Sequence, residues 1–138
     1  MTNGVRLIRN PDLAQTVDYA YAAEAETPVR AVWTAGACPL DTAGATVAPG
    51  DYAGQARQVM RNLTAALEAA GASLTDIVKT TVYVASSRQE DLTEAWDVVR
   101  AHMGDHDAPS TLLGVTVLGY DAQLVEVEAV AVITGARP

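Results

Sequence analysis

The sequence predicts an α+β fold, in which a mainly antiparallel sheet carries two helices on one of its faces. Short segments rich in β-branched and alternating apolar residues predict strands, and two longer segments with apolar residues at helical spacing predict helices. The last strand segment, Leu124–Ile133, has one fully apolar face that suits packing against those helices. With 138 residues, 49% of them hydrophobic, the chain is expected to form one domain over residues 1–138 around one core.

The first third of the chain is expected to hold two short strands and a loop. The strands are predicted at Tyr19–Ala25 and Arg30–Ala35, and the turn-like segment Glu26–Pro28 separates them. The segment Asp41–Gly50 is rich in Gly, Ala and Pro, which is typical of a loop.

A helix is expected next, over Tyr52–Ala70, where apolar residues recur at helical spacing. Asp51 can cap its start and Gly71 suits its end. The segment Asp76–Val84 then predicts a strand, because it is rich in β-branched residues. The residues expected to share one face of that strand are Val78, Thr80, Val82 and Val84.

The second half of the chain predicts one more helix and two more strands. The helix is expected to open at Ser87, with Glu90 completing a capping box, and to stop at Gly104. Its apolar stripe consists of Leu92, Ala95, Trp96, Val99 and Met103. The strands are predicted at Thr111–Val117 and Gln123–Thr134.

Charge and cysteine content argue against several classes of protein. The chain carries 17 acidic and 9 basic residues, a formal charge of −8, without a basic cluster, whereas nucleic-acid binding depends mainly on Lys and Arg at phosphates. Cys38 is the sole cysteine, which excludes an internal disulfide and fits a reducing compartment. The N-terminus lacks the apolar run of a signal peptide, and no segment is long enough to span a bilayer. We therefore expect a cytoplasmic protein without a nucleic-acid or membrane partner.

The second face of the last strand predicts an oligomer. It mixes Glu126 and Glu128 with Leu124, Val130 and Val132. Such a face is too apolar to be fully solvated, and its two carboxylates are too polar to be simply buried. We therefore expect another subunit to cover this face, with Glu126 or Glu128 at a cleft.

Four segments resemble the RidA (YjgF) family in their order and spacing: Trp33–Asp41, Gln55–Leu63, Asp76–Val84 and Val125–Val132. The resemblance covers nearly the whole chain from Tyr19 onward. It implies a chorismate-mutase-like fold and a homotrimer with three clefts between subunits. It also implies hydrolytic deamination of reactive enamines and imines, without a cofactor or metal.

The same resemblance suggests site residues. Glu126 falls where the family has the carboxylate that positions the attacking water. The expected substrate-binding residues are Tyr19, Gly36, Thr93, Ser110 and Thr111. Each also fits a structural reading, such as an interface carboxylate for Glu126 or a strand-end glycine with unusual dihedral angles for Gly36.

The chain departs from the family at the group that would hold a substrate carboxylate. The family's Pro-Ala-Arg before the fifth strand corresponds here to Ala108-Pro109-Ser110, and its Thr-Ser-Gly-Gln reads Thr34-Ala35-Gly36-Ala37. A guanidinium holds a carboxylate through two charge-assisted bonds, whereas serine offers a neutral hydroxyl. We therefore do not expect an efficient 2-imino acid deaminase, unless another basic residue such as Arg100 or Lys79 reaches the cleft.

Other candidates have weaker support. Cys38 sits beside Gly36 in the chain, but no neighbouring histidine lowers its pKa, so a packing role is favoured over a nucleophile. His102 and His106 have metal-pair spacing, yet Gly104 breaks the helix between them.

Two function classes remain open: an imine or enamine hydrolase that uses Glu126, and a non-catalytic trimer that binds a metabolite or partner. Ribonuclease activity, also attached to the family, is disfavoured by the charge of −8.

Overall fold

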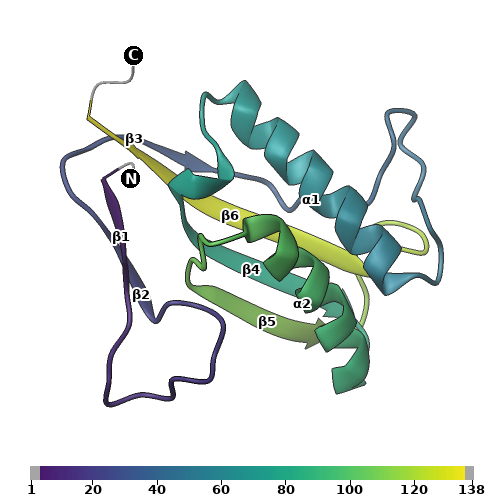
Figure 1. Cartoon of the computed structure of the whole chain (residues 1–138). Helices are drawn as coiled ribbons and strands as arrows, with labels where there is room; N and C mark the ends of the chain where they lie inside the picture. The colour runs from purple at the N-terminus through teal and green to yellow at the C-terminus, as the bar shows by residue number, and fades with distance from the viewer. Residues whose placement is uncertain (1–3, 136–138) are drawn as a thin grey trace.

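The computed structural model describes residues 4–135, except for the side chains of Pro28 and Val29. Two helices lie over one face of a four-stranded sheet, and a separate pair of strands stands beside it (Figure 1). The elements in chain order are β1 (Val5–Ile8), β2 (Ala22–Ala25), β3 (Pro28–Trp33), α1 (Tyr52–Ala69), the short 3-10 helix η1 (Leu74–Asp76), β4 (Ile77–Ala85), α2 (Gln89–Met103), β5 (Ser110–Val115) and β6 (Val125–Thr134). This arrangement confirms the predicted α+β fold class.

The sheet has the strand order β3-β6-β4-β5. β6 is antiparallel to both β3 and β4, and β4 is parallel to β5, with α2 as the crossover between them. β1 and β2 form their own antiparallel pair, and the sequence analysis did not predict β1. The predicted strand at Tyr19–Ala25 starts only at Ala22, because the backbone of Ala20 instead donates to Asp107 after α2.

β6 divides the molecule into a core side and an open side. Its predicted apolar face is confirmed, because Val125, Val127, Ala129, Ala131 and Ile133 are all buried beneath the helices. The opposite side is turned away from α1 and α2 (Figure 1). We call it the uncovered face and define it by Trp33, Lys79, Thr81, Tyr83, Thr111, Leu113, Glu126, Glu128, Val130 and Val132. All ten residues are half-buried or exposed.

One predicted strand face is wrong at a single residue. Thr80, Val82 and Val84 are buried on the helix side of β4 as expected, but Val78 is half-buried and Ile77 is buried in its place. The pairing of β4 with β6 shifts between Ile77 and Lys79, so an irregularity at Val78 breaks the alternation of faces there.

The predicted ends of α1 are confirmed. The Asp51 side chain accepts a hydrogen bond from the backbone of Gly54 at 2.9 Å. At the other end, Gly71 has φ +79°, its N–H donates to Glu68 O, and the N–H of Ala72 donates to Leu67 O, which together form a Schellman motif.

The predicted start of α2 is wrong by one residue. The N-cap is Arg88, and no side chain caps the helix there. The serine that does act near this end is Ser86, whose hydroxyl accepts from the Arg88 N–H and donates to Asp91. Neither Ser87 nor Glu90 therefore forms the expected capping box.

Candidate functional site

Glu126 is held on the uncovered face with one carboxylate oxygen bound and the other free. β6 places it opposite Tyr83 of β4, where it is half-buried. Oε1 accepts from Gln123 Nε2 at 3.1 Å and lies 3.3 Å from the Cys38 thiol. Within residues 4–135, Oε2 has no hydrogen-bond partner. This oxygen is therefore available to water or a ligand.

Gly36 lies directly against that free oxygen. The segment after β3 continues along β6, with the Thr34 N–H donating to Ala129 O and the Ala37 N–H to Val127 O. A Cβ on Gly36 would stand 2.1 Å from Glu126 Oε2, which is impossible without displacing the carboxylate. Gly36 is not among the glycines with positive φ, so the expectation of unusual dihedral angles is wrong. Glycine is needed here for space.

Cys38 contacts Glu126 as a hydrogen-bond donor. Asn62 of α1 holds the loop around it by donating to the backbone carbonyls of Cys38 and Leu40, at 2.8 and 2.9 Å. Burial and the adjacent Glu126 carboxylate raise the pKa of the Cys38 thiol to about 11. At neutral pH the thiol is protonated, which opposes the alternative of a thiolate nucleophile.

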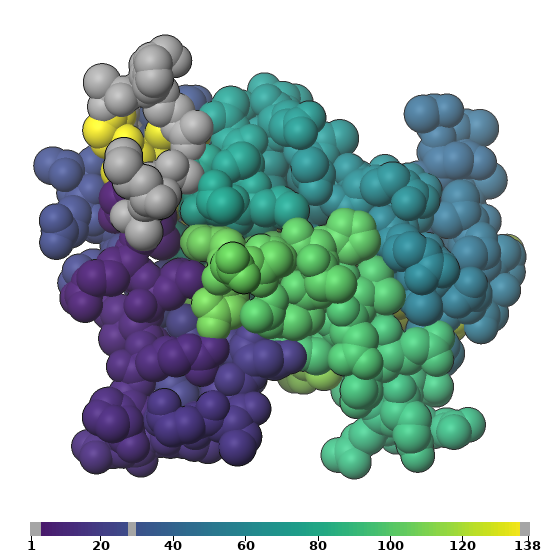
Figure 2. All heavy atoms as spheres, viewed as in Figure 1, coloured from purple at the N-terminus to yellow at the C-terminus, as the bar shows by residue number. Residues whose placement is uncertain are grey.

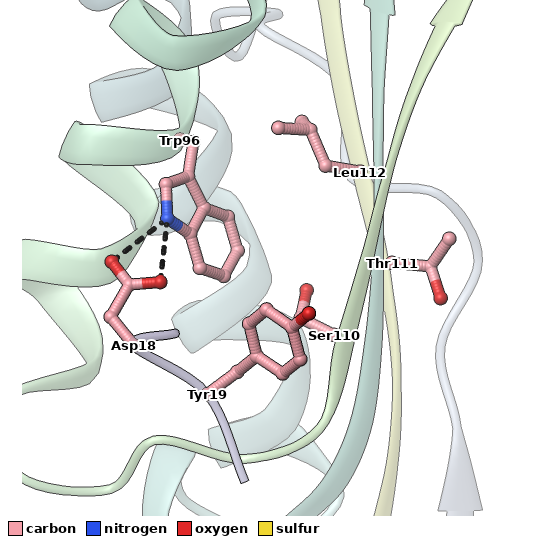
Figure 3. A pocket seen from close by; sticks show the side chains of 6 residues that line it. All are labelled: Asp18, Tyr19, Trp96, Ser110, Thr111 and Leu112. Atoms are coloured by element: carbon pink, nitrogen blue, oxygen red, sulfur yellow. Dashed lines mark hydrogen bonds between the residues drawn. The ribbon is translucent and has the colours of Figure 1, made fainter. Parts of the chain in front are cut away.

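A cavity of about 390 Å³ brings Tyr19, Ser110 and Thr111 together at the outer edge of the sheet. Its lining residues are Asp18, Tyr19, Trp96, Ser110, Thr111 and Leu112 (Figure 3). The indole N–H of Trp96 donates to both carboxylate oxygens of Asp18, at 3.0 and 3.2 Å. Figure 2 shows the N-terminal segment, in purple, directly against the green surface of α2 and the loop that follows it.

Ser110 and Thr111 point to opposite faces of β5. Ser110 accepts a 2.6 Å hydrogen bond from the buried hydroxyl of Thr80 on the helix side. Thr111 accepts from Lys79 Nζ at 2.6 Å on the uncovered face. In Figure 3, Ser110 and Tyr19 lie on one side of the strand and Thr111 on the other. The cavity edge therefore connects the two faces of the sheet.

Thr93 is the one expected binding residue that stands apart from these groups. It is exposed on α2, where its hydroxyl donates to the Gln89 carbonyl one turn earlier, and it does not line the cavity. Asp18 and Trp96 line the cavity instead. Helical spacing placed Trp96 only in the apolar stripe of α2, because spacing does not show where an indole N–H points.

Neither basic candidate lines the cavity. Arg100 donates to the backbone carbonyls of Asp18 and Gly104. Lys79 is bound to Thr111 on the uncovered face. No Lys or Arg lines the cavity in the described part of the chain, and its one charged lining residue is Asp18.

Glu128 has a structural partner next to the candidate site. Its Oε1 accepts from the Tyr83 hydroxyl at 2.9 Å, and this hydrogen bond raises the pKa of Tyr83.

The two histidines bind backbone instead of each other: His102 contacts Val98 O and His106 contacts Ile77 O. Among residues 4–135 no group of three or more His, Cys, Asp or Glu side chains is arranged to hold a metal ion.

Comparison with known proteins identifies the family. A family model described as Endoribonuclease L-PSP matches residues 13–133. The chain belongs to the RidA family. A RutC family protein of Pyrococcus horikoshii is 35% identical over 100 residues, covering 72% of this chain and 77% of that protein. A 2-iminobutanoate/2-iminopropanoate deaminase of Salmonella typhimurium is 36% identical over 104 residues, covering 73% and 78%.

Solved structures of RidA-family proteins share the fold. The Rid protein YyfB from Yersinia pestis, described as of unknown function, superposes with a TM-score of 0.86 at 27% identity, covering 94% of this chain and 98% of that one. Yeast Mmf1 superposes with a TM-score of 0.68 at 26% identity, covering 91% and 92%. None of the helices in residues 4–135 is long and apolar enough to cross a membrane.

Within one RidA-family chain the candidate groups form two separate halves. Tyr19 and Ser110 lie at the outer edge beyond β5, on the helix side. Glu126 and Gly36 lie on the uncovered face at β6, and β4 stands between β6 and β5. A single chain does not bring all of these residues to one ligand.

Proposed function

We propose that this chain is a cofactor-independent hydrolase of imines or enamines that works in clefts between the subunits of a homotrimer. The observation that carries this proposal is the Glu126 carboxylate, half-buried, held through Oε1 and open at Oε2. The proposal is supported by relatives named 2-iminobutanoate/2-iminopropanoate deaminase at 36% identity.

The chemistry needs a group that takes a proton from water and later gives it back. Water adds to the carbon of C=NH, and its proton passes to Glu126 Oε2. That proton passes on to nitrogen, which gives a carbinolamine. The hydroxyl proton of this intermediate then moves through Oε2 to the same nitrogen, the C–N bond breaks, and ammonia leaves as the carbonyl forms. An enamine first takes a proton at carbon and loses one from nitrogen, which gives the imine. General acid–base catalysis of this kind contributes about 10²- to 10⁴-fold to a rate.

A homotrimer would complete the site. The cavity at Tyr19 and the carboxylate at Glu126 lie on different sides of one sheet, so a neighbouring subunit must supply one half. The uncovered face carries apolar side chains suited to such a contact, including Trp33, which is 73% exposed, and Leu113, which is 41% exposed.

The preferred substrate is a neutral or cationic imine. The cavity holds Asp18 and no basic side chain among its lining residues, so a substrate carboxylate would meet negative charge instead of a counter-ion. Arg100 does not replace the missing arginine, because it does not line the cavity and two backbone carbonyls anchor its side chain. We expect slower turnover of 2-iminopropanoate than of a neutral ketimine of similar size.

Ammonia release from both imines tests the proposal. Glu126→Gln keeps the size of the side chain but removes the proton acceptor, so we expect about a 10²- to 10⁴-fold loss of kcat. Glu128→Gln is the matched control on the same strand face, and it should keep most of the activity. Equal turnover by the wild type and Glu126→Gln would remove the assigned role, and no acceleration by the wild type would reject the hydrolase.

The second candidate is a non-catalytic trimer that binds a small metabolite or partner in the same clefts. The absence of basic side chains from the cavity lining favours it, because the substrate clamp expected from the family is missing. Ligands that raise the melting temperature without being turned over would support this alternative. Ribonuclease action is not proposed, because a net charge of −8 opposes binding of a polyanion.

A further inference from the structure

We propose that Gln123, assisted by Cys38, is a positioning residue that fixes the plane of the Glu126 carboxylate and leaves Oε2 as its working oxygen. This inference rests on the proposed function, because it assigns residues that orient the proposed proton acceptor. Three side chains carry it: Gln123 of the β5–β6 loop, Cys38 of the loop after β3 and Glu126 at the start of β6. Gln123 and Cys38 both contact Glu126.

The Gln123 amide has one possible orientation. Its side chain is 4% exposed, and its Oε1 accepts from the Tyr120 N–H at 3.0 Å. Its Nε2 donates to Val125 O and to Glu126 Oε1, both at 3.1 Å. Exchanging the oxygen and nitrogen would place a donor against Tyr120 N–H and an acceptor against two oxygens. The amide therefore always presents an N–H to Glu126.

Cys38 supplies a second donor to the same oxygen. Its Sγ lies 3.3 Å from Glu126 Oε1 and 3.4 Å from the Gly36 carbonyl, so its single hydrogen can point to either. Asn62 fixes the backbone of this loop, which keeps the thiol within reach. Because the thiol is the weaker donor and has two acceptors, Gln123 is the stronger restraint.

The consequence is a carboxylate that is oriented before a substrate arrives. One oxygen is tied to buried structure, while the other faces Gly36 and has no partner in the described part of the chain. A preorganised acceptor needs no rotation during the reaction, and orientation of reacting groups can supply a large share of a rate enhancement. Loss of Gln123 should lower kcat and leave KM nearly unchanged, because the substrate is held by other residues.

If Gln123 only stabilised the fold, replacing it should lower kcat no more than replacing another buried glutamine of the same region. Gln55 provides this matched control. Gln55 is also buried and ties α1 to the same region by bonding the backbone of Ala48, Ala122 and Leu124. It makes no described contact with Glu126. Gln55→Met therefore disturbs the same loop without releasing the carboxylate.

The kinetic test compares Gln123→Met with Gln55→Met, and Cys38→Ala with Cys38→Ser, on a neutral ketimine and on 2-iminopropanoate. Hydrogen bonds to a charged group are worth about 1.5–3 kcal/mol, so we expect kcat to fall about ten- to a hundred-fold in Gln123→Met. Gln55→Met should lose less than about threefold, and Cys38→Ser should retain more activity than Cys38→Ala. Equal losses in the two glutamine variants, or a rise in KM alone, would overturn the inference.

A second measurement does not depend on turnover. The rate of Cys38 alkylation by iodoacetamide, followed against pH, should give a midpoint near the thiol pKa of about 11 in the wild type. Glu126→Gln should lower this midpoint because the carboxylate raises the thiol pKa, and Gln123→Met should raise it because the amide lowers that pKa. Unchanged midpoints in both variants would show that the three side chains do not meet. If the wild type hydrolyses neither imine, the proposed function fails, and this titration alone decides whether the carboxylate is held.

Discussion

At the residue scale, the free space beside Glu126 matters as much as the carboxylate itself. Gly36 has no side chain, and the position that a Cβ would take is already close to Oε2. The family resemblance pointed to Glu126 and Gly36 separately. Their contact depends on the pairing of Ala37 with Val127, which joins segments far apart in the chain.

Substituting Gly36→Ala should therefore act on Glu126 and not on the fold. The added methyl group would lie 2.1 Å from Oε2, so the carboxylate must turn away and imine hydrolysis should fall at least about tenfold. Gly119→Ala is the control, because nothing lies within 4 Å of its Cβ position and its φ is not positive. Melting curves should show similar stability for both variants; normal activity in Gly36→Ala would contradict the assigned geometry.

The pH dependence of stability gives an independent check on Cys38. Folding raises the thiol pKa from 9.0 to about 11, so the unfolded chain loses this proton at lower pH than the folded chain. The stabilisation linked to Cys38 is complete below pH 9.0 and is lost as pH rises toward about 11. Tyr83, whose pKa is also raised from 10.0, adds a loss in the same direction.

Urea unfolding from neutral pH to pH 11 measures this effect. The free energy of unfolding should fall less steeply with alkaline pH in Cys38→Ala than in the wild type, and less steeply again when Tyr83→Phe is added. The comparison between variants cancels groups that titrate equally in all of them. Parallel curves for the wild type and both variants would show that neither group is perturbed by folding.

At the element scale, the regular strands and helices were predictable and the irregular joints were not. Alternation along β6 identified its buried face without error, because its pairing with both neighbours fixes which side faces the helices. The same reasoning failed at Val78, where a one-residue irregularity reverses the faces. It also missed β1, whose four residues are too few to show a period.

The candidate site also combines residues that the sequence suggested with residues that it did not. Tyr19, Ser110 and Thr111 line one cavity, whereas Thr93 does not line it, and their role in binding a substrate stays a prediction. Gln123 carried no signal in the sequence, because its role arises from a loop that folds back on β6. Contacts of this kind depend on tertiary structure, so local patterns do not reveal them.

The missing N-cap of α2 leads to a prediction at this scale. Arg88 occupies the cap position with extended dihedral angles but no capping side chain. Arg88→Ser should add a side-chain acceptor for the N–H groups of the first turn and stabilise the protein by about 1 kcal/mol. The ion pair it removes, to Glu90 at 3.6 Å, is exposed and contributes little. Ser87→Ala should be neutral; a loss of about 1 kcal/mol there would restore Ser87 as the cap.

At the scale of the whole molecule, the uncovered face is the feature that one chain does not explain. It combines apolar side chains with the free oxygen of Glu126, and both helices lie on the other side of the sheet (Figure 1). Alternation along the last strand predicted this mixture, but the number and arrangement of the subunits depend on surface complementarity, which the pattern does not encode. The proposed trimer accounts for both the apolar residues and the incomplete site.

Assembly and activity should therefore be lost together when this face is made charged. Leu113→Lys introduces an ammonium group on the edge strand β5 of the uncovered face, where it would have to be desolvated on assembly. The matched control is Leu13→Lys, because Leu13 is 45% exposed and Leu113 is 41% exposed, but Leu13 lies between β1 and β2 and not on a strand of the four-stranded sheet. Light scattering after size exclusion should give about three times the 14.4 kDa of one chain for the wild type and the control, and a smaller species without hydrolase activity for Leu113→Lys. A monomeric wild type that still hydrolyses imines would contradict the trimer and require both halves of the site to act within one chain.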